Sequence, residues 1–326
     1  MKVRIGISAG GESLAPDEMV ALGHAIADTG FDSLWLPEVL TRPGPDPLVG
    51  LSWVSGACPK LKVGTTMLLP GRNLVWLAKA IATLDQLSGG RFLLTFVPGL
   101  GIGGERSAIG IPSAERAALM EDALPVLRRL WSGEVVSHSG PAGLFADVSV
   151  SPRPVQEPFD VWLGGNVPSA LERCGRLADG WLPAFCTPSD AAAGRAVIER
   201  VASEHDRAIS PEHFGVSLAY APEGTDLGSL ASSPLARRAR GRPLDQLIPV
   251  GLKGLRTTLE QFLEVGFSKF VVRPTAPPGA WPDELAELAS AVGDLQTCAP
   301  ARAGSARPTR HRRPVRCIAC PSNRSP

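Results

Sequence analysis

The sequence lacks long apolar runs, and none of its 326 positions begins a stretch of about 18 consecutive hydrophobic residues. A membrane-spanning helix is therefore not expected. The first residues also lack the apolar core of a signal peptide, because Val3, Ile5 and Ile7 alternate with polar or small residues as in a β-strand. Without an export signal, the six cysteines are interpreted as reduced thiols, and a cytoplasmic location is predicted.

The chain as a whole also lacks an excess of either charge, since 33 Lys and Arg residues face 32 Asp and Glu residues. This balance gives no reason to expect nucleic acid or a membrane surface as a partner. The C-terminal end differs, because it holds seven Arg and no acidic residue between positions 299 and 326. We expect one domain at 1–298 and a basic, disordered tail at 299–326.

Residue sets that are typical of several enzyme classes are missing as well. No group of His, Asp and Glu has the spacing of metal ligands, so no metal site is expected. Cys317 and Cys320 have the spacing of half a zinc site, but no second Cys or His pair accompanies them, and we interpret the pair as incidental. No Ser lies in a nucleophile elbow, which argues against a hydrolase.

The chain does contain a regular alternation of strand-like and helix-like segments. The predicted strands cover residues 3–8, 33–37, 61–69, 92–97, 160–164, 180–183, 213–220 and 269–273. Helical periodicity follows each of them, from Pro16 after the first strand to residues 282–295 after the last. Eight such units predict an α/β fold, the (β/α)8 TIM barrel, and a doubly wound sheet is the alternative.

In a TIM barrel, function lies at the C-terminal ends of the strands and in the loops after them. Gly164, Gly165 and Asn166 end one predicted strand, and a helix begins at Pro168. Free backbone N–H groups at such a helix start can bind an anion. From the residues alone, a plain tight turn is an equal alternative.

Two further features lie at predicted strand ends. Glu38 ends the second strand and is a candidate proton carrier, with a surface salt bridge, for example to Arg42, as the alternative. Gly99-Leu-Gly-Ile-Gly-Gly104 literally matches a dinucleotide-binding motif, but the helix that this motif requires is delayed past Pro112. We interpret the match as accidental and the segment as a loop over the end of the barrel.

Several longer motifs follow one another along the chain. They are Ser33-Leu-Trp-Leu-Pro-Glu38, Gly64-Thr-Thr-Met-Leu-Leu-Pro-Gly-Arg-Asn73, Leu77-Ala-Lys-Ala-Ile-Ala-Thr-Leu-Asp-Gln-Leu-Ser-Gly-Gly-Arg91, Val161-Trp-Leu-Gly-Gly-Asn166, Arg176-Leu-Ala-Asp-Gly-Trp-Leu-Pro183 and Phe270-Val-Val-Arg273. In this order they resemble the bacterial luciferase-like oxidoreductases over residues 2–295. Within that family the chain is most similar to the actinobacterial branch that uses the deazaflavin coenzyme F420.

The resemblance implies a barrel that holds a flavin-like ring where the C-terminal ends of the strands lie. It implies a non-prolyl cis peptide at Thr66–Met67 behind the ring, and a phosphate-binding turn at Gly164, Gly165 and Asn166. Gly99, at the start of the loop after the fourth strand, is included among the expected coenzyme contacts. The coenzyme would perform the hydride transfer, and the protein would supply orientation and electrostatics.

The sequence also departs from the family. Many relatives have His after the acid that follows the second strand, whereas this chain has Val39 after Glu38. Sugar-phosphate dehydrogenases of the deazaflavin branch have an acid after the fourth strand, whereas this chain has Leu100. Oxidation of a sugar phosphate is therefore not expected. Proton donation would fall to Glu38, to a loop residue or to water.

These features predict an oxidoreductase that binds coenzyme F420 and transfers a hydride to or from a small organic substrate. Residues 98–112 and 222–250 are the expected substrate loops, and a homodimer is considered. An FMN-dependent monooxygenase is the alternative within the fold. A phosphate-handling barrel isomerase or lyase, and a coenzyme-binding protein without catalysis, are the alternatives from other classes.

Overall fold

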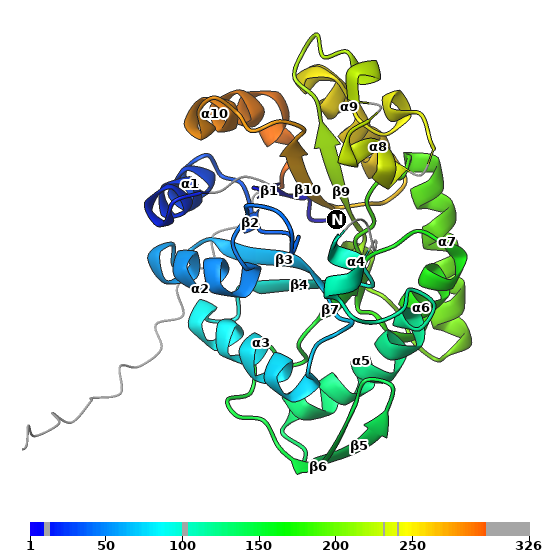
Figure 1. Cartoon of the computed structure of the whole chain (residues 1–326). Helices are drawn as coiled ribbons and strands as arrows, with labels where there is room; N and C mark the ends of the chain where they lie inside the picture. Colours follow the sequence, from blue (N-terminus) through cyan, green and yellow to red (C-terminus); the bar gives the residue numbers. More distant parts are fainter. Residues whose placement is uncertain (10–13, 100–103, 231, 240, 298–326) are drawn as a thin grey trace, which may run out of the picture.

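Eight parallel strands form the centre of the molecule, and helices cover their outer face (Figure 1). This computed structural model describes residues 1–9, 14–99, 104–230, 232–239 and 241–297. The eight strands are β1 (Arg4–Ser8), β2 (Ser33–Trp35), β3 (Lys62–Leu68), β4 (Phe92–Val97), β7 (Val161–Leu163), β8 (Gly180–Trp181), β9 (Gly215–Tyr220) and β10 (Lys269–Pro274).

The strands follow one another around the sheet in the order in which they occur in the sequence, β8-β7-β4-β3-β2-β1-β10-β9 when read from one edge to the other. The two edges of this sheet meet, because the backbone N–H of Ser217 donates to the carbonyl of Pro183 at 2.8 Å. A second bridge joins Trp181 to Phe214. The sheet therefore closes on itself, which excludes the doubly wound alternative and confirms the predicted TIM barrel.

Each barrel strand is followed by a helix that packs on the outside. The helices are α1 (Pro16–Asp28), α2 (Pro47–Ala57), α3 (Leu74–Ser88), α5 (Arg116–Ser132), α6 (Pro168–Leu177), α7 (Pro188–Glu204), α9 (Gly251–Glu264) and α10 (Trp281–Val292). Local sequence sets their ends. For α3, the Asn73 side chain accepts hydrogen bonds from the backbone N–H groups of Val75 and Trp76 at 3.0 and 3.1 Å, and Gly89 ends the helix with φ +65°.

The side chains of β10 point alternately to the two faces of the sheet and so belong to two different cores. Phe270 and Val272 belong to the large core between the sheet and the helices. Val271 packs inside the barrel against Trp35, and the ammonium group of Lys269 lies 5.9 Å from the ring of the same Trp35. Because side chains on a strand alternate with a period of two, Arg273 points into the barrel as well, one layer nearer to the C-terminal ends of the strands.

The same alternation places small residues around Arg273 in that last inner layer. Ser8, Thr66, Gly164 and Ala219 occupy the corresponding inward positions of β1, β3, the end of β7 and β9. Side chains of this size leave the backbone of the barrel rim accessible to a ligand. The layer below is filled by large side chains, among them Trp35, so the barrel is a packed core and not a pore.

Several elements are added to the eight units. They are the short helices α4 (Gly104–Ala108) and α8 (Pro234–Ala239), the antiparallel hairpin β5 (Val136–Gly140) and β6 (Gly143–Val148), and the 3-10 helices η1 (Pro211–His213), η2 (Leu227–Leu230), η3 (Leu244–Gln246) and η4 (Gly293–Leu295). The sequence predicted irregular structure where the hairpin lies. In the 222–250 segment, a small core around Leu235, Leu247 and Ile248 packs on Ala221 at the end of β9.

Other expectations from the sequence have different outcomes. None of the helices in the described part of the chain is long and apolar enough to cross a membrane. Cys58, Cys174 and Cys186 are buried free thiols, as expected. The expected tail at 299–326 lies outside the described residues, so the proposed domain boundary stays a prediction.

Candidate active site

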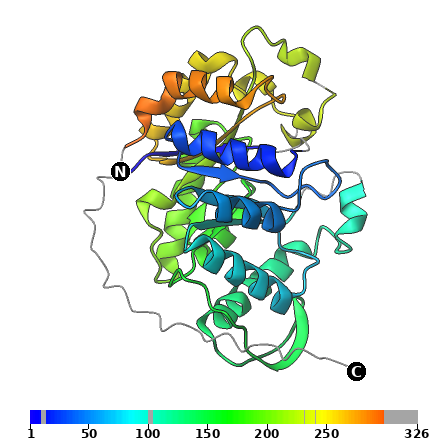
Figure 2. The same cartoon turned by 90° about the vertical axis from the view of Figure 1, so that its left-hand side faces the viewer.

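The C-terminal ends of the strands open on one side of the molecule, which we call the mouth. In Figure 2, α4, the loop after β2 and the 222–250 segment lie on this side, and the N-terminus lies on the opposite side. Helix α4 is joined to the loop after β2, because Oε1 of Glu105 accepts a hydrogen bond from the backbone N–H of Leu40 at 3.0 Å. The segments expected to meet a substrate therefore lie at the mouth.

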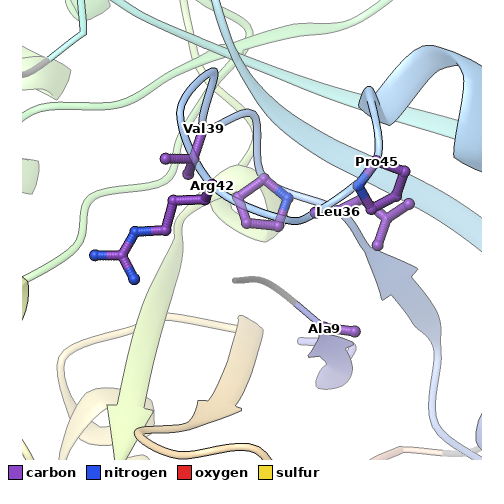
Figure 3. A pocket seen from close by; sticks show the side chains of 7 residues that line it. Ala9, Leu36, Val39, Arg42 and Pro45 are labelled. Carbon is purple, nitrogen blue, oxygen red and sulfur yellow. The ribbon is translucent and has the colours of Figure 1, made fainter. Parts of the chain in front are cut away.

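A small cavity lies between the ends of β1 and β2. It has a volume of about 10 Å³ and is lined by Ala9, Leu36, Pro37, Val39, Arg42, Gly44 and Pro45. In Figure 3 the side chain of Arg42 extends away from Ala9 and Pro45. Pockets for organic ligands are typically about 300–1,000 Å³. The cavity between Ala9 and Pro45 is therefore too small for a coenzyme ring.

Glu38 follows β2 and is buried, with 3% of its side chain exposed. Its Oε2 accepts a hydrogen bond from the backbone N–H of Leu68 at 2.7 Å, and its Oε1 accepts one from Nη2 of Arg72. Arg72 also donates from Nε to the carbonyl of Leu68 at 2.8 Å. The charge partner of Glu38 is thus Arg72 in the loop after β3, and the alternative of a surface salt bridge to Arg42 is wrong.

Burial raises the pKa of the Glu38 carboxyl group, and the charge of Arg72 and the hydrogen bond from Leu68 lower it to a smaller extent. The backbone N–H of Glu38 also donates to the carbonyl of Thr66 at 2.8 Å. Glu38 therefore joins the end of β2 to the end of β3 through its backbone and through both carboxylate oxygens. A role as proton carrier would require one of these bonds to open, and it stays a prediction.

The expectation of a cis peptide at Thr66–Met67 is wrong. Among the described residues, cis peptides occur at Ser151–Pro152 and Glu157–Pro158. The ladder between β3 and β4 continues without a break through Thr66, Met67 and Leu68, and this regular pairing requires extended trans backbone. Thr66 faces the interior of the mouth, whereas the side chain of Met67 is fully buried in the core under the helices.

The turn formed by Gly164, Gly165 and Asn166, which we call the 164–166 turn, connects β7 to α6 at the mouth. Gly165 has φ +107°, and a Cβ atom added to it would lie 3.1 Å from the Cβ of Ala170. In the described part of the chain, nothing accepts a hydrogen bond from the backbone N–H of Gly165 or Asn166, and α6 begins without a side-chain cap. These N–H groups are free to donate to a ligand, and binding of an anion at this turn stays a prediction.

The side chain of Asn166 connects this turn to the residues after β8. Its Nδ2 donates to the carbonyls of Ala184 and Phe185, each at 3.4 Å. Phe185 has φ +56°, a left-handed conformation that is unusual for a bulky residue. The guanidinium carbon of Arg238, from α8, lies 5.6 Å from the centre of the Phe185 ring. The turn is thereby linked to the 222–250 segment.

A second cavity, of about 70 Å³, adjoins the 164–166 turn. It is lined by Asn166, Leu171, Trp181, Asp190, Gly194 and Arg242. Nη1 of Arg242 forms an ion pair with Asp190 at 2.7 Å, and Nε1 of Trp181 donates to the carbonyl of Gly165 at 2.8 Å. The bond from Trp181 fixes the orientation of the Gly165 peptide, and the cavity has room for several water molecules.

Gly99 lies at the end of β4 and has φ +78°. A Cβ atom on it would lie 2.9 Å from Cδ2 of Leu68, so the position requires glycine for packing. Arg116 is buried beside it and donates from Nη1 to the carbonyl of Pro98 at 3.3 Å. Contact between Gly99 and a coenzyme stays a prediction. Residues 100–103, including Leu100, lie outside the described residues.

Three arginines at the mouth were not expected from the sequence to be site residues. Arg273 could have been found, since a charged residue occupies an inward position at the end of the last predicted strand. Arg42 was considered only as a partner for Glu38. Arg238 belongs to an Arg-rich stretch of the 222–250 segment, which was expected to be a substrate loop, but none of its arginines was singled out.

A comparison with known proteins agrees with this architecture. The model of the luciferase-like monooxygenase family matches residues 2–226. An F420-dependent glucose-6-phosphate dehydrogenase of Kineococcus radiotolerans is 28% identical over 193 residues, which are 55% of this chain and 56% of that protein. The chain therefore spans about half the length of this relative.

Two solved structures share the fold. One is an F420-dependent secondary alcohol dehydrogenase, with a TM-score of 0.78 at 17% identity over 91% of this chain and 100% of that chain. The other is the coenzyme F420-dependent tetrahydromethanopterin reductase of Methanopyrus kandleri, with a TM-score of 0.74 at 18% identity and the same coverage. At these identities the likeness concerns the fold alone, but the family match covers more than half of the sequence. The chain therefore belongs to the luciferase-like monooxygenase family of enzymes.

Proposed function

We propose that this protein is an oxidoreductase that uses coenzyme F420 and transfers a hydride between the deazaflavin and a small organic substrate. The F420-dependent relative from Kineococcus radiotolerans supports the choice of coenzyme. The observation that carries the proposal is the 164–166 turn. Its unpartnered N–H groups lie at the start of α6 and at the mouth, where a barrel enzyme binds its ligands.

The residues present fit a coenzyme that carries a phosphate group and a flat ring. A Cβ atom on Gly164 would lie 2.6 Å from Cγ1 of Val97, and Gly165 has a backbone conformation that favours glycine, so the turn has no side chain over its N–H groups. In our proposal the N–H groups of Gly165 and Asn166 hold the phosphate. Thr66, which faces the interior from β3, lies beneath the ring.

The bound deazaflavin would supply the hydride chemistry. The chain's own residues would bind and orient it: Glu38 and Arg72 hold the end of β3 in place, and the described parts of 98–112 and 222–250 would contact the substrate. An isomerase or lyase would instead need an acid–base pair at the mouth. The carboxylate of Glu38 is already engaged by Leu68 and Arg72, so that alternative has less support.

The proposal is tested by titrating the purified protein with coenzyme F420 and, separately, with FMN. Trp181 donates a hydrogen bond to Gly165, so tryptophan fluorescence reports on ligands at the turn. We expect saturable quenching by F420 at least about tenfold tighter than by FMN, which is a difference of about 1.4 kcal/mol. A preference for FMN would favour the monooxygenase alternative, and binding of neither would contradict the proposal.

We also propose that two copies associate as a homodimer through α2 and α3, which pack against each other (Figure 1). Trp53 on α2 and Trp76 on α3 are 56% and 79% exposed, and exposed tryptophans are enriched at interfaces. Light scattering should show a dimer for the native chain. Replacement of Trp53 and Trp76 by Lys should yield the monomer, and a monomeric native chain would refute this part of the proposal.

A further inference from the structure

Arg273 lies at an inward-facing position near the end of β10. It precedes Pro274, the last residue of β10, on the face that points into the barrel above Val271 and Lys269, and it is half-buried. Its neighbours in the last inner layer are small, and Ser8 of β1 and Ala219 of β9 lie on the adjoining strands. The guanidinium group of Arg273 therefore lies within the mouth and not on the outer surface.

Two more arginines approach Arg273 from opposite directions. Arg238 comes from α8 and stacks on Phe185, whose segment follows β8 and lies beside β9. Arg42 comes from the loop after β2 and lines the cavity with Ala9, the residue that follows β1. Because β9 and β1 are the two neighbours of β10, both segments lie next to the strand that carries Arg273. We call Arg42, Arg238 and Arg273 the arginine cluster.

The positive charge of the cluster is not balanced by the part of the chain that the structure describes. No carboxylate of the described residues lies within 4.0 Å of any of the three guanidinium groups, and none of these groups donates a hydrogen bond to a described residue. Glu105 is the acidic residue whose charge favours the charged form of Arg238 and so acts to raise its pKa. Its Oε1 already accepts a hydrogen bond from the backbone N–H of Leu40.

Burial and the like charges of Arg238 and Arg42 lower the pKa of Arg273 to about 10. Burial and Arg42 also lower the pKa of Arg238. Arg273, with a pKa of about 10, still carries its charge at neutral pH, so its guanidinium group is held close to like charges. An anion bound between the groups would remove this repulsion and would supply acceptors for charge-assisted hydrogen bonds.

We propose that the arginine cluster binds the carboxylate or phosphate group of an anionic substrate. This inference rests on the proposed function, because it assigns the substrate class of the same mouth. The strand order places β10 across the barrel from β4, whereas the 164–166 turn follows β7, the neighbour of β4. An anionic group bound at Arg273 would thus be separated from the coenzyme phosphate, and the reacting carbon of the substrate would lie between the two.

The test is calorimetric titration of the full chain with inorganic phosphate, with and without saturating coenzyme F420. We expect saturable binding that Arg238→Gln and Arg273→Gln each weaken at least about tenfold, since each removes charge-assisted hydrogen bonds. Arg237→Gln is the matched control, because Arg237 is the exposed neighbour of Arg238 on the same short helix. This control should bind phosphate within about twofold of the native chain.

The titrations with and without coenzyme F420 show whether the cluster binds an anionic group of the substrate or the phosphate of the coenzyme. If the cluster binds substrate, phosphate and F420 bind together, and Arg238→Gln leaves the affinity for F420 unchanged. Competition between phosphate and F420, with loss of F420 affinity in Arg238→Gln, would assign the cluster to the coenzyme and overturn the proposal. Equal phosphate affinity in the native chain and Arg238→Gln would also overturn it.

The phosphate titration tests the arginine cluster even if the proposed function is wrong. If the native chain does not bind F420, the proposed function fails, but phosphate titration of the chain alone still measures the arginine cluster. Thermal unfolding of each variant shows whether it folds. If Arg273→Gln is unstable, Arg238→Gln carries the test, because Arg238 lies in a short helix outside the barrel strands.

Discussion

Replacement of Gly165 by valine is expected to weaken the binding of coenzyme F420 by about ten- to a hundredfold while the barrel stays folded. Gly165 has φ +107°, which a β-branched residue adopts only with strain of about 1–3 kcal/mol. The new Cβ would also lie 3.1 Å from Ala170 at the start of α6. The turn must move to relieve the backbone strain and the contact with Ala170. The N–H groups of Gly165 and Asn166 would then no longer point at the same anion.

A matched control separates this effect from general backbone strain. Gly30 has φ +83°, and a Cβ atom on it would meet nothing within 4 Å. It lies between α1 and β2, at the end of the barrel opposite the mouth. Gly30→Val should therefore lower stability without changing coenzyme affinity. Fluorescence titration of both variants checks the prediction, and equal affinity of Gly165→Val and the native chain would show that the 164–166 turn does not hold the phosphate.

Replacement of Glu38 by alanine is expected to lower the free energy of unfolding by about 2 kcal/mol. The change leaves the backbone N–H of Leu68 without an acceptor and Arg72 without its charge partner. Glu38→Gln should cost less than about 1 kcal/mol, because the amide oxygen can still accept the bond from Leu68. Urea denaturation of the two variants measures the difference, and equal losses would contradict this account of the site.

The raised pKa of Glu38 predicts the direction in which the stability of the protein changes with pH. The pKa of Glu38 is raised from 4.5 in the folded protein, so the folded state binds more protons than the unfolded state above pH 4.5. The stability of the native chain relative to Glu38→Gln should therefore decrease as the pH rises from 4.5 through the raised folded pKa. Urea denaturation at several pH values tests this, and an increase over the same range would mean that the attraction of Arg72 outweighs burial.

The barrel could be predicted from the sequence because its signals are local. Alternation identifies each strand, and residues such as Pro16 and Asn73 begin the helices at their observed positions. The hairpin of β5 and β6 was missed because it packs little surface into the core. Leu144, for example, is an apolar residue of β6 that is 82% exposed, so apolar residues do not mark the buried face of the hairpin.

The site was only partly predictable for a physical reason. The 164–166 turn and Glu38 lie at strand ends, and the barrel rule places both at the mouth. The partner of Glu38 depends on the path of the loop after β3, which brings Arg72 to it in place of Arg42. The arginine cluster depends on closure of the barrel, because β1 pairs with β10 across more than two hundred residues of sequence.

The central claim, that this barrel binds F420 at the 164–166 turn, is tested most directly by a crystal structure of the protein with the coenzyme. The account predicts a coenzyme phosphate within hydrogen-bond distance of the N–H groups of Gly165 and Asn166, with the ring over Thr66. The arginine cluster should remain free to bind an added anion. A coenzyme phosphate bound by Arg238 and Arg273, or a ring outside the mouth, would contradict it.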